Sequence, residues 1–129
     1  MILLDTHVLV WMNGVSRKLS RAAVSAIRRA QVHDGLAISA VSLVELARLI
    51  AANRIDQIGS VEETIEKLIE GISIRPITTE IAALTTYFPP DFPFDPADRT
   101  IAATARVENL PLVTADERIL ACPLLKTIW

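Results

Sequence analysis

The chain has 129 residues and a mass of 14.1 kDa, and 51% of its residues are hydrophobic. This length and composition predict one domain, residues 1–129, with a single core. The net charge of −2 excludes a strongly basic or strongly acidic protein. No apolar run approaches the ~18 residues of a membrane span, and Asp5 stands where a signal peptide carries basic residues, so we expect a cytoplasmic protein.

The first part of the chain predicts strands and helices in alternation. The apolar run ILLD, residues 2–5, has the length of a buried strand. Apolar residues then recur at helical spacing over residues 20–30, and LAIS, residues 36–39, predicts a second strand. A strong helix follows, with Ser42 as its N-cap and Glu45 three places later, at the capping-box position.

The rest of the chain continues this alternation. The predicted elements are a helix at 61–70, a strand at 72–77, helices at 78–88 and 95–110, a strand at 110–114, a helical turn at 115–120 and a closing strand at 124–129. Asp95 and Pro96 are typical of an N-cap and a first helical residue. Strands alternating with helices predict an α/β fold with a mainly parallel sheet.

The segment YFPPDFPF, residues 87–94, contains three of the seven prolines and four of the six aromatic residues. We expect a packed loop here, because aromatic side chains commonly fill cores. Aromatic faces also stack on splayed RNA bases, so a contact with RNA or with a partner protein stays open as an alternative.

Basic residues gather in a window without acids. No Asp or Glu lies between Thr6 and His33, whereas five basic residues do: Arg17, Lys18, Arg21, Arg28 and Arg29. Ten of the 13 basic residues are arginine, whose planar guanidinium suits phosphate oxygens. This window is compatible with a nucleic-acid surface, and a solvated helix face is the alternative.

Four acids stand where a predicted strand ends or a predicted helix begins. Asp5 ends the first strand, and Asp116 closely follows the strand at 110–114. Glu45 and Asp98 each lie in the first turn of a helix. In an open parallel sheet these places gather along one edge, outside the carboxyl ends of the strands.

Helix capping is a local explanation for each acid taken singly. Taken together, clustered carboxylates raise one another's pKa values unless a cation compensates them, and Mg²⁺ prefers such oxygen ligands. A bound metal lowers the pKa of a water and neutralises charge on a phosphate, and a second ion ~4 Å away can stabilise the leaving oxygen. The cluster therefore indicates phosphodiester hydrolysis. Setting the four acids aside leaves 11 acidic against 13 basic residues, a mild excess that permits RNA binding.

Four segments together resemble a PIN-domain ribonuclease. They are LLDTHVLVW, SAVSLVELARL, DPADRTIAATA and LPLVTADERI. More closely, the chain is similar to the VapC toxins of type II toxin–antitoxin modules. The resemblance covers nearly the whole chain and is carried by four acids in the family's order.

The resemblance implies a PIN-like α/β/α sandwich around a parallel sheet of about five strands, and RNA cleavage that depends on Mg²⁺ or Mn²⁺. Asp5, Glu45 and Asp98 match the family's metal-site acids. Asp116 matches a fourth acid that assists a second metal or positions the water. All four are thus expected to be catalytic and metal-binding. A homodimer and a cognate VapB-like antitoxin, whose tail lies across the active site, are also implied.

Polar neighbours of these acids are candidates for holding them or the substrate. Thr6, Ser42 and Thr114 are suited to hold a carboxylate or a water, and local capping is the alternative. Arg99 directly follows Asp98 and points about 100° away around the helix. A structural salt bridge is therefore favoured over a phosphate contact for this arginine.

Two further residues stand close to the predicted site. His7 follows Asp5 by two places, but Mg²⁺ prefers oxygen, so packing or support of an acid is favoured over metal ligation. Asp95 is expected to be a helix cap, although it is near enough in the sequence to reach the site.

Rival functions remain open on the sequence alone. A receiver-type phosphoacceptor domain needs two adjacent acids after the first strand, and Asp5 has no acidic neighbour. A haloacid-dehalogenase-type phosphatase needs a second aspartate where this chain has His7. A PIN nuclease in RNA processing without a toxin role, and binding without catalysis, are further alternatives. Metal-dependent turnover excludes the last of these.

Overall fold

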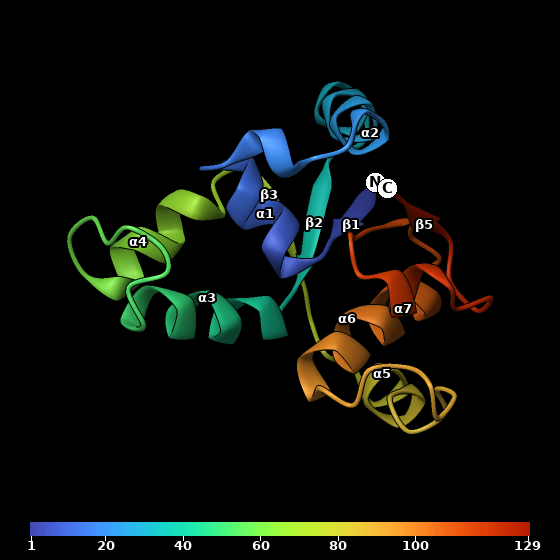
Figure 1. The fold of residues 1–129 in the computed structure, drawn as a ribbon. Coiled ribbons are helices and arrows are strands. Elements are labelled where there is room, and N and C mark those ends of the chain that lie inside the picture. Colours follow the sequence, from blue (N-terminus) through green and yellow to red (C-terminus); the bar gives the residue numbers. More distant parts are fainter.

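The computed structural model describes residues 1–129 and contains one sheet of five parallel strands with helices on both faces (Figure 1). The strands are β1 (Ile2–Leu4), β2 (Leu36–Ser39), β3 (Ile72–Arg75), β4 (Leu112–Val113) and β5 (Thr127–Ile128). Their order across the sheet is β3-β2-β1-β4-β5, and every neighbouring pair is parallel. The predicted α/β/α sandwich with a parallel five-stranded sheet is confirmed.

Seven α-helices and one 3-10 helix connect the strands. They are α1 (Thr6–Met12), the 3-10 helix η1 (Ser16–Lys18), α2 (Arg21–Val32), α3 (Val41–Ala51), α4 (Val61–Leu68), α5 (Thr79–Leu84), α6 (Pro96–Val107) and α7 (Glu117–Leu120). The sequence pattern does not predict η1. None of the helices has the length and apolar character needed to cross a membrane.

The sheet separates two hydrophobic cores because successive residues of a strand point to opposite faces. In β1, Ile2 and Leu4 pack into the core that α1 and α2 cover, whereas Leu3 packs into the core that α6 covers. In β2, Ile38 packs into the core that α1 and α2 cover, and Ala37 packs into the core that α6 covers. The central strands are therefore buried on both sides, as their short apolar runs indicate.

The position of the site follows from the order of the strands. The chain passes from β1 to β2 and β3 on one side, and then places β4 on the other side of β1 (Figure 1). Ligand sites in open parallel sheets lie at such a reversal, outside the carboxyl ends of the strands. Asp5 follows β1 and Thr114 follows β4, so both residues lie at this point.

One predicted helix cap is wrong. Ser42 does not cap α3, because the helix begins at Val41 and Ser42 lies within it. The Ser39 hydroxyl accepts instead from the Val41 amide, at 3.2 Å. Glu45 is consequently not part of a capping box, and its carboxylate has another partner. The predicted N-cap at Asp95 is confirmed, since its carboxylate accepts from the Ala97 amide.

Residues 87–94 form the predicted packed loop. The rings of Phe88 and Phe92 are buried and stack with centroids 4.4 Å apart. Tyr87 and Phe94 are 75% and 80% exposed. The loop thus contributes two aromatic side chains to the core and presents two to solvent.

Candidate active site

Three of the predicted site acids line one cavity. Asp5 lies in the turn between β1 and α1, Glu45 lies in the first half of α3, and Asp98 lies in the first turn of α6. Asp95, the N-cap of α6, lines the same cavity, which has a volume of about 300 Å³. Segments up to 93 residues apart in the sequence thus bring their carboxylates to one place.

Asp5 is held from three sides and is only 3% exposed. Its Oδ1 accepts from the Thr6 amide at 2.8 Å, which makes it the N-cap of α1. Its Oδ2 accepts from the Thr114 hydroxyl at 2.8 Å and lies 3.4 Å from Nδ1 of His7. Asp5 is therefore confirmed as a helix cap, and the cap geometry is compatible with a place in the acid cavity.

Glu45 is oriented by hydroxyl groups rather than by a basic side chain. Thr6 donates from its hydroxyl to Oε1 of Glu45, and the Thr6 and Ser42 hydroxyls are 2.8 Å apart. Burial raises the pKa of Glu45, and the hydrogen bond from Thr6 lowers it in part. Thr6, Ser42 and Thr114 are all buried beside the acids, where the sequence places them.

The acids of this cavity repel one another. Burial raises the pKa of Asp98 to about 7, and the negative charges of its four neighbours add to the rise: Asp5, Asp95, Glu45 and Asp116. No lysine or arginine forms an ion pair with Asp5, Glu45 or Asp98. The arrangement is thus a half-buried group of carboxylates that forms no ion pair with a lysine or arginine.

Asp116 stands at the margin of this group. Its Oδ1 accepts from the Arg118 amide at 2.9 Å, so it caps α7, and its side chain does not line the cavity. It is nevertheless close enough for its charge to raise the pKa of Asp98. Its amide donates to the Thr114 hydroxyl at 3.1 Å, which connects it to Asp5 through one residue.

The donor set fits Mg²⁺ or Mn²⁺. As the side chains stand, no three or more Asp, Glu, His or Cys groups converge as ligands of one ion. Mg²⁺ does not need such a cage, because it keeps several waters and commonly takes one or two carboxylates together with substrate phosphates. Carboxylate oxygens that form no ion pair with a lysine or arginine are ligands of this kind.

His7 supports Asp5 through a defined tautomer. Its Nε2 accepts from the Ala115 amide at 3.2 Å, so that nitrogen carries no proton and is occupied. The proton then lies on Nδ1, the atom that faces Asp5. This geometry agrees with the predicted supporting role and leaves no free nitrogen for a metal.

Arg99 is directed away from the acids. Its Nε donates to the Pro93 carbonyl at 2.8 Å and its Nη1 donates to the Thr85 carbonyl at 3.0 Å. The guanidinium also lies over the rings of Phe92 and Phe94, at 5.8 and 5.5 Å from their centroids. The predicted salt bridge of Arg99 is wrong, because main-chain carbonyls of the loop take the place of a carboxylate.

The sequence interpretation missed one residue of the cavity. Arg48 lines it together with Glu45. Residues three places apart lie on one face of a helix, so the spacing of Glu45 and Arg48 carries a signal that could have identified it. Asp95, considered only as a near neighbour, also lines the cavity.

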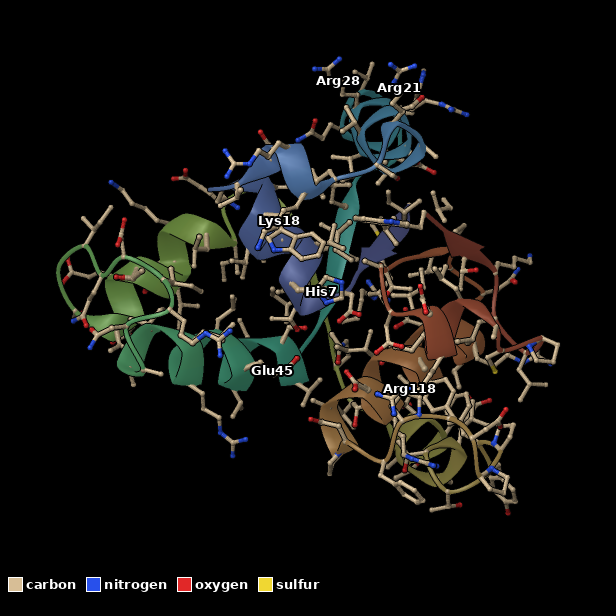
Figure 2. The ribbon with its side chains drawn as sticks, viewed as in Figure 1. His7, Lys18, Arg21, Arg28, Glu45 and Arg118 are labelled. Carbon is tan, nitrogen blue, oxygen red and sulfur yellow. The ribbon has the colours of Figure 1, made fainter.

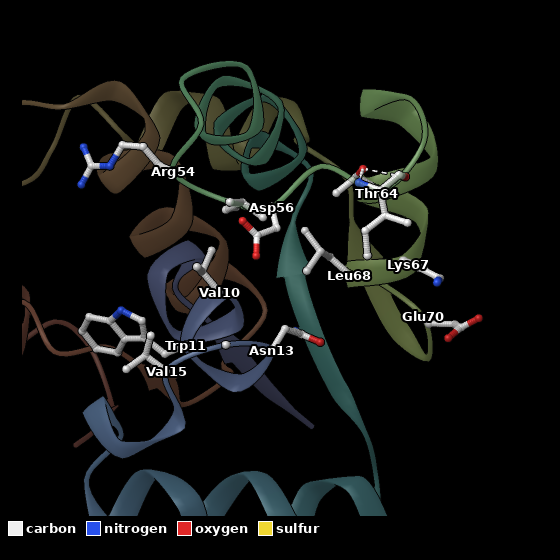
Figure 3. A pocket seen from close by; sticks show the side chains of 13 residues that line it. Val10, Trp11, Asn13, Val15, Arg54, Asp56, Thr64, Lys67, Leu68 and Glu70 are labelled. Carbon is white, nitrogen blue, oxygen red and sulfur yellow. Dashed lines mark hydrogen bonds between the residues drawn. The ribbon is translucent and has the colours of Figure 1, made fainter.

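A larger cavity of about 580 Å³ lies away from these acids, between α1, the turn after it, the segment that follows α3, and α4 (Figure 3). Trp11, Val15 and Leu68 contribute apolar side chains to its wall, and Asp56 and Glu70 are its acids. It contains none of the predicted site residues.

Comparisons with known proteins agree with this fold. The model of the PIN domain family matches residues 2–122. Ribonuclease VapC22 of Mycobacterium tuberculosis is 39% identical over 130 residues, which cover 99% of this chain and 98% of that protein. The chain therefore belongs to the PIN-domain family. The resemblance to VapC proteins that the sequence motifs indicate is confirmed by this relative.

Solved structures show the same fold at low sequence identity. VapBC2 from Rickettsia felis, bound to a DNA fragment from its promoter, matches with a TM-score of 0.74 and 17% identity, over 98% of this chain and 97% of that chain. DNA-bound VapBC from Salmonella typhimurium matches with a TM-score of 0.69 and 19% identity, over the same shares of the two chains.

Proposed function

We propose that this protein is a metal-dependent endoribonuclease that acts as the toxin of a VapBC-type toxin–antitoxin system. Membership of the PIN-domain family and the 39% identity to a ribonuclease support the reaction. The observation that carries the proposal is the cavity in which Asp5, Glu45 and Asp98 gather without an ion pair to a lysine or arginine.

Asp5, Glu45 and Asp98 would hold a Mg²⁺ or Mn²⁺ ion. When bound, the ion lowers the pKa of a coordinated water and neutralises charge on the scissile phosphate. Thr114 and Thr6 fix the carboxylates of Asp5 and Glu45 by hydrogen bonds. Asp116, at the margin, is suited to orient the attacking water or to support a second ion.

The proposed partners come from the relatives. The structural neighbours are VapBC and toxin–antitoxin complexes, so we propose a cognate VapB-like antitoxin for this chain, and a homodimer on the family resemblance. We also propose that the protein works in the cytoplasm, where such a toxin meets RNA.

The test is cleavage of total RNA and of pooled transfer RNA by the purified protein, freed of antitoxin, in Mg²⁺, in Mn²⁺ and in EDTA. Discrete cuts that need the metal are expected. Asp98→Asn should keep the fold and lower the rate more than about a hundredfold, because it removes a ligand rather than a supporting group. A folded, metal-supplied wild type that cuts neither pool would contradict the proposal.

A further inference from the structure

Five basic residues form an exposed surface that the candidate active site does not use. We call them the basic strip: Arg17, Lys18, Arg21, Arg28 and Arg29, on η1 and α2. None of the five forms an ion pair. The nearest acid in the sequence, Asp34, pairs with the amino terminus. The positive charge of the strip is therefore uncompensated.

Three arginines of the strip surround one hollow. Arg21, Arg28 and Arg29 recur at a spacing of seven and eight residues, which places them along one side of α2. Together with Leu19, Val24 and Ser25 they line a shallow depression of about 450 Å³. Guanidinium groups converging on an open hollow are suited to bind phosphate oxygens.

A continuous series of contacts joins the acid cavity to the strip. His7 lines the cavity beside Asp5, and its ring lies 4.8 Å from the ring of Trp11. Lys18 of the strip lies over Trp11, with Nζ 5.6 Å from the ring centroid. Figure 2 shows Glu45, His7 and Lys18 in succession, and then Arg21 and Arg28 on α2.

The charges elsewhere in the molecule favour this surface for a polyanion. The acid cavity itself repels a phosphate backbone until a metal is bound. Arg75 is paired with Glu108, and Arg99 binds main-chain carbonyls. Arg106 and Lys126 donate to neighbouring oxygens of the protein. The strip therefore holds five cations without an ion pair in one stretch of the chain, and Arg29 alone among them donates to a protein oxygen, that of Ser25.

We propose that the basic strip binds the sugar–phosphate backbone of the RNA on one side of the scissile bond, and that the strand reaches the acid cavity across Trp11 and His7. This inference rests on the proposed ribonuclease function. Phosphates contact the arginines of α2 and η1, while the exposed part of the Trp11 ring offers a base a surface to stack on.

The test is binding of a fluorescein-labelled, single-stranded oligouridylate in EDTA, measured by fluorescence anisotropy over a series of KCl concentrations. The variant is the double substitution Arg28→Gln and Arg29→Gln. The matched control is Arg106→Gln with Lys126→Gln, which removes the same amount of charge outside η1 and α2, at residues that donate to other oxygens of the protein. Each preparation is also assayed for cleavage of total RNA with Mg²⁺ or Mn²⁺.

The strip variant should bind about 10- to 30-fold more weakly at about 0.1 M salt, and the slope of log affinity against log salt should fall in magnitude by about 1.4, because two phosphate contacts are lost. The control should lose much less affinity and keep its slope. Equal affinity and slope in wild type and strip variant, with cleavage retained, would overturn the strip proposal alone.

The two proposals fail differently. If the wild type neither cuts nor binds RNA, both the proposed ribonuclease function and the proposed role of the strip are contradicted. A strip variant that keeps its RNA affinity but loses binding to the antitoxin shows a protein-binding surface and overturns the inference.

A second experiment tests whether RNA passes over Trp11. In Trp129→Phe, which leaves Trp11 as the single tryptophan, bound RNA should quench the remaining fluorescence. Unchanged emission at saturating RNA would exclude Trp11 from the path.

Discussion

Thr114 connects two acids that lie far apart in the sequence. Its hydroxyl donates to Oδ2 of Asp5 and accepts from the amide of Asp116, and its side chain is fully buried. The hydroxyl therefore fixes the rotamer of the most deeply buried acid and the start of α7 at the same time. Because this hydroxyl is buried, no water replaces it when it is removed, and Oδ2 of Asp5 keeps only its contact with His7.

Replacing this hydroxyl tests its positioning role. Thr114→Val keeps the shape of the side chain but removes both hydrogen bonds, so we expect the free energy of unfolding to fall by about 1–3 kcal/mol. The cleavage rate should fall about 10- to 100-fold, as is typical when support for a metal ligand is lost. Urea denaturation and a cleavage assay measure the two effects. Thr114→Ser, which retains the hydroxyl, should be much closer to wild type, and equal losses in both variants would contradict the role.

Asp98 makes the metal-free protein sensitive to pH. Its pKa rises from the ordinary 3.8 to about 7 on folding, chiefly through burial. Between these values the folded chain binds more protons than the unfolded chain, so the free energy of unfolding falls as pH rises from about 4 to about 7. Glu45, whose pKa is also raised, acts in the same direction.

The expected result is that Asp98→Asn, in EDTA, unfolds at a higher temperature than wild type at a pH of about 7.5, and that the difference shrinks toward a pH of about 5. Thermal unfolding followed by circular dichroism at several pH values measures this. Glu117→Gln is a matched control, because that exposed residue does not contribute to the shift of Asp98. Parallel profiles for wild type and Asp98→Asn would contradict the shifted pKa.

The sequence predicts the kinds and the order of the site residues, but not their partners. Asp5 stands at a strand end and Asp98 in the first turn of a helix, where topology brings them together, whereas Glu45 lies beyond the first turn of α3 in which it was predicted. The hydrogen bond between Asp5 and Thr114 joins residues 109 positions apart, and no local pattern records such a pair. Whether the four acids ligate a metal stays a prediction.

At the level of elements, Arg99 joins α6 to the loop at 87–94. Its hydrogen bond to Pro93 and its contacts with the rings of Phe92 and Phe94 hold the loop against α6, and its hydrogen bond to Thr85 reaches the end of α5. Arg99→Lys keeps the charge but cannot donate in both directions at once. We expect about 1–2 kcal/mol less stability and faster chymotrypsin cleavage after Tyr87 and Phe94, which are already exposed.

Limited proteolysis with mass spectrometry identifies those cleavage sites. Arg106→Lys is the control, because Arg106 also donates to a main-chain carbonyl, that of Leu124, at a distance from the loop. Similar cleavage of the wild type and the two variants at 87–94 would show that Arg99 does not hold the loop.

The strands were predictable because each combines an apolar run with a polar end, and their residue ranges agree with the structure to within a few positions. The start of α3 was not predictable, because its N-cap is Ala40, which has no capping side chain, and the Ser39 hydroxyl before it accepts from the Val41 amide. The hydrogen-bond partners of Arg99 were also not predictable, because any residue type can supply a main-chain carbonyl such as that of Pro93.

At the scale of the whole molecule, a bound metal should neutralise the charges of the carboxylates that repel one another in the acid cavity and so stabilise the fold. Mg²⁺ or Mn²⁺ at 100 times its dissociation constant stabilises the fold by about 2.7 kcal/mol. We expect a rise of several degrees in the unfolding temperature at a pH of about 7.5, a smaller rise at about 5.5 because protons compete for the carboxylates, and none in Asp98→Asn. Differential scanning calorimetry measures this, and EDTA should remove the rise. An equal rise in wild type and variant would place the ion elsewhere.

The central strand of the sheet is also the first to be synthesised. β1 begins at Ile2, but β4, which pairs with it, ends at Val113, and the hydroxyl that holds Asp5 belongs to the next residue. During translation Asp5 is therefore synthesised long before Thr114, the residue whose hydroxyl holds it. Asp5 therefore reaches its folded position only after β4 has been made and has paired with β1, so the acid cavity cannot form from the first strands alone.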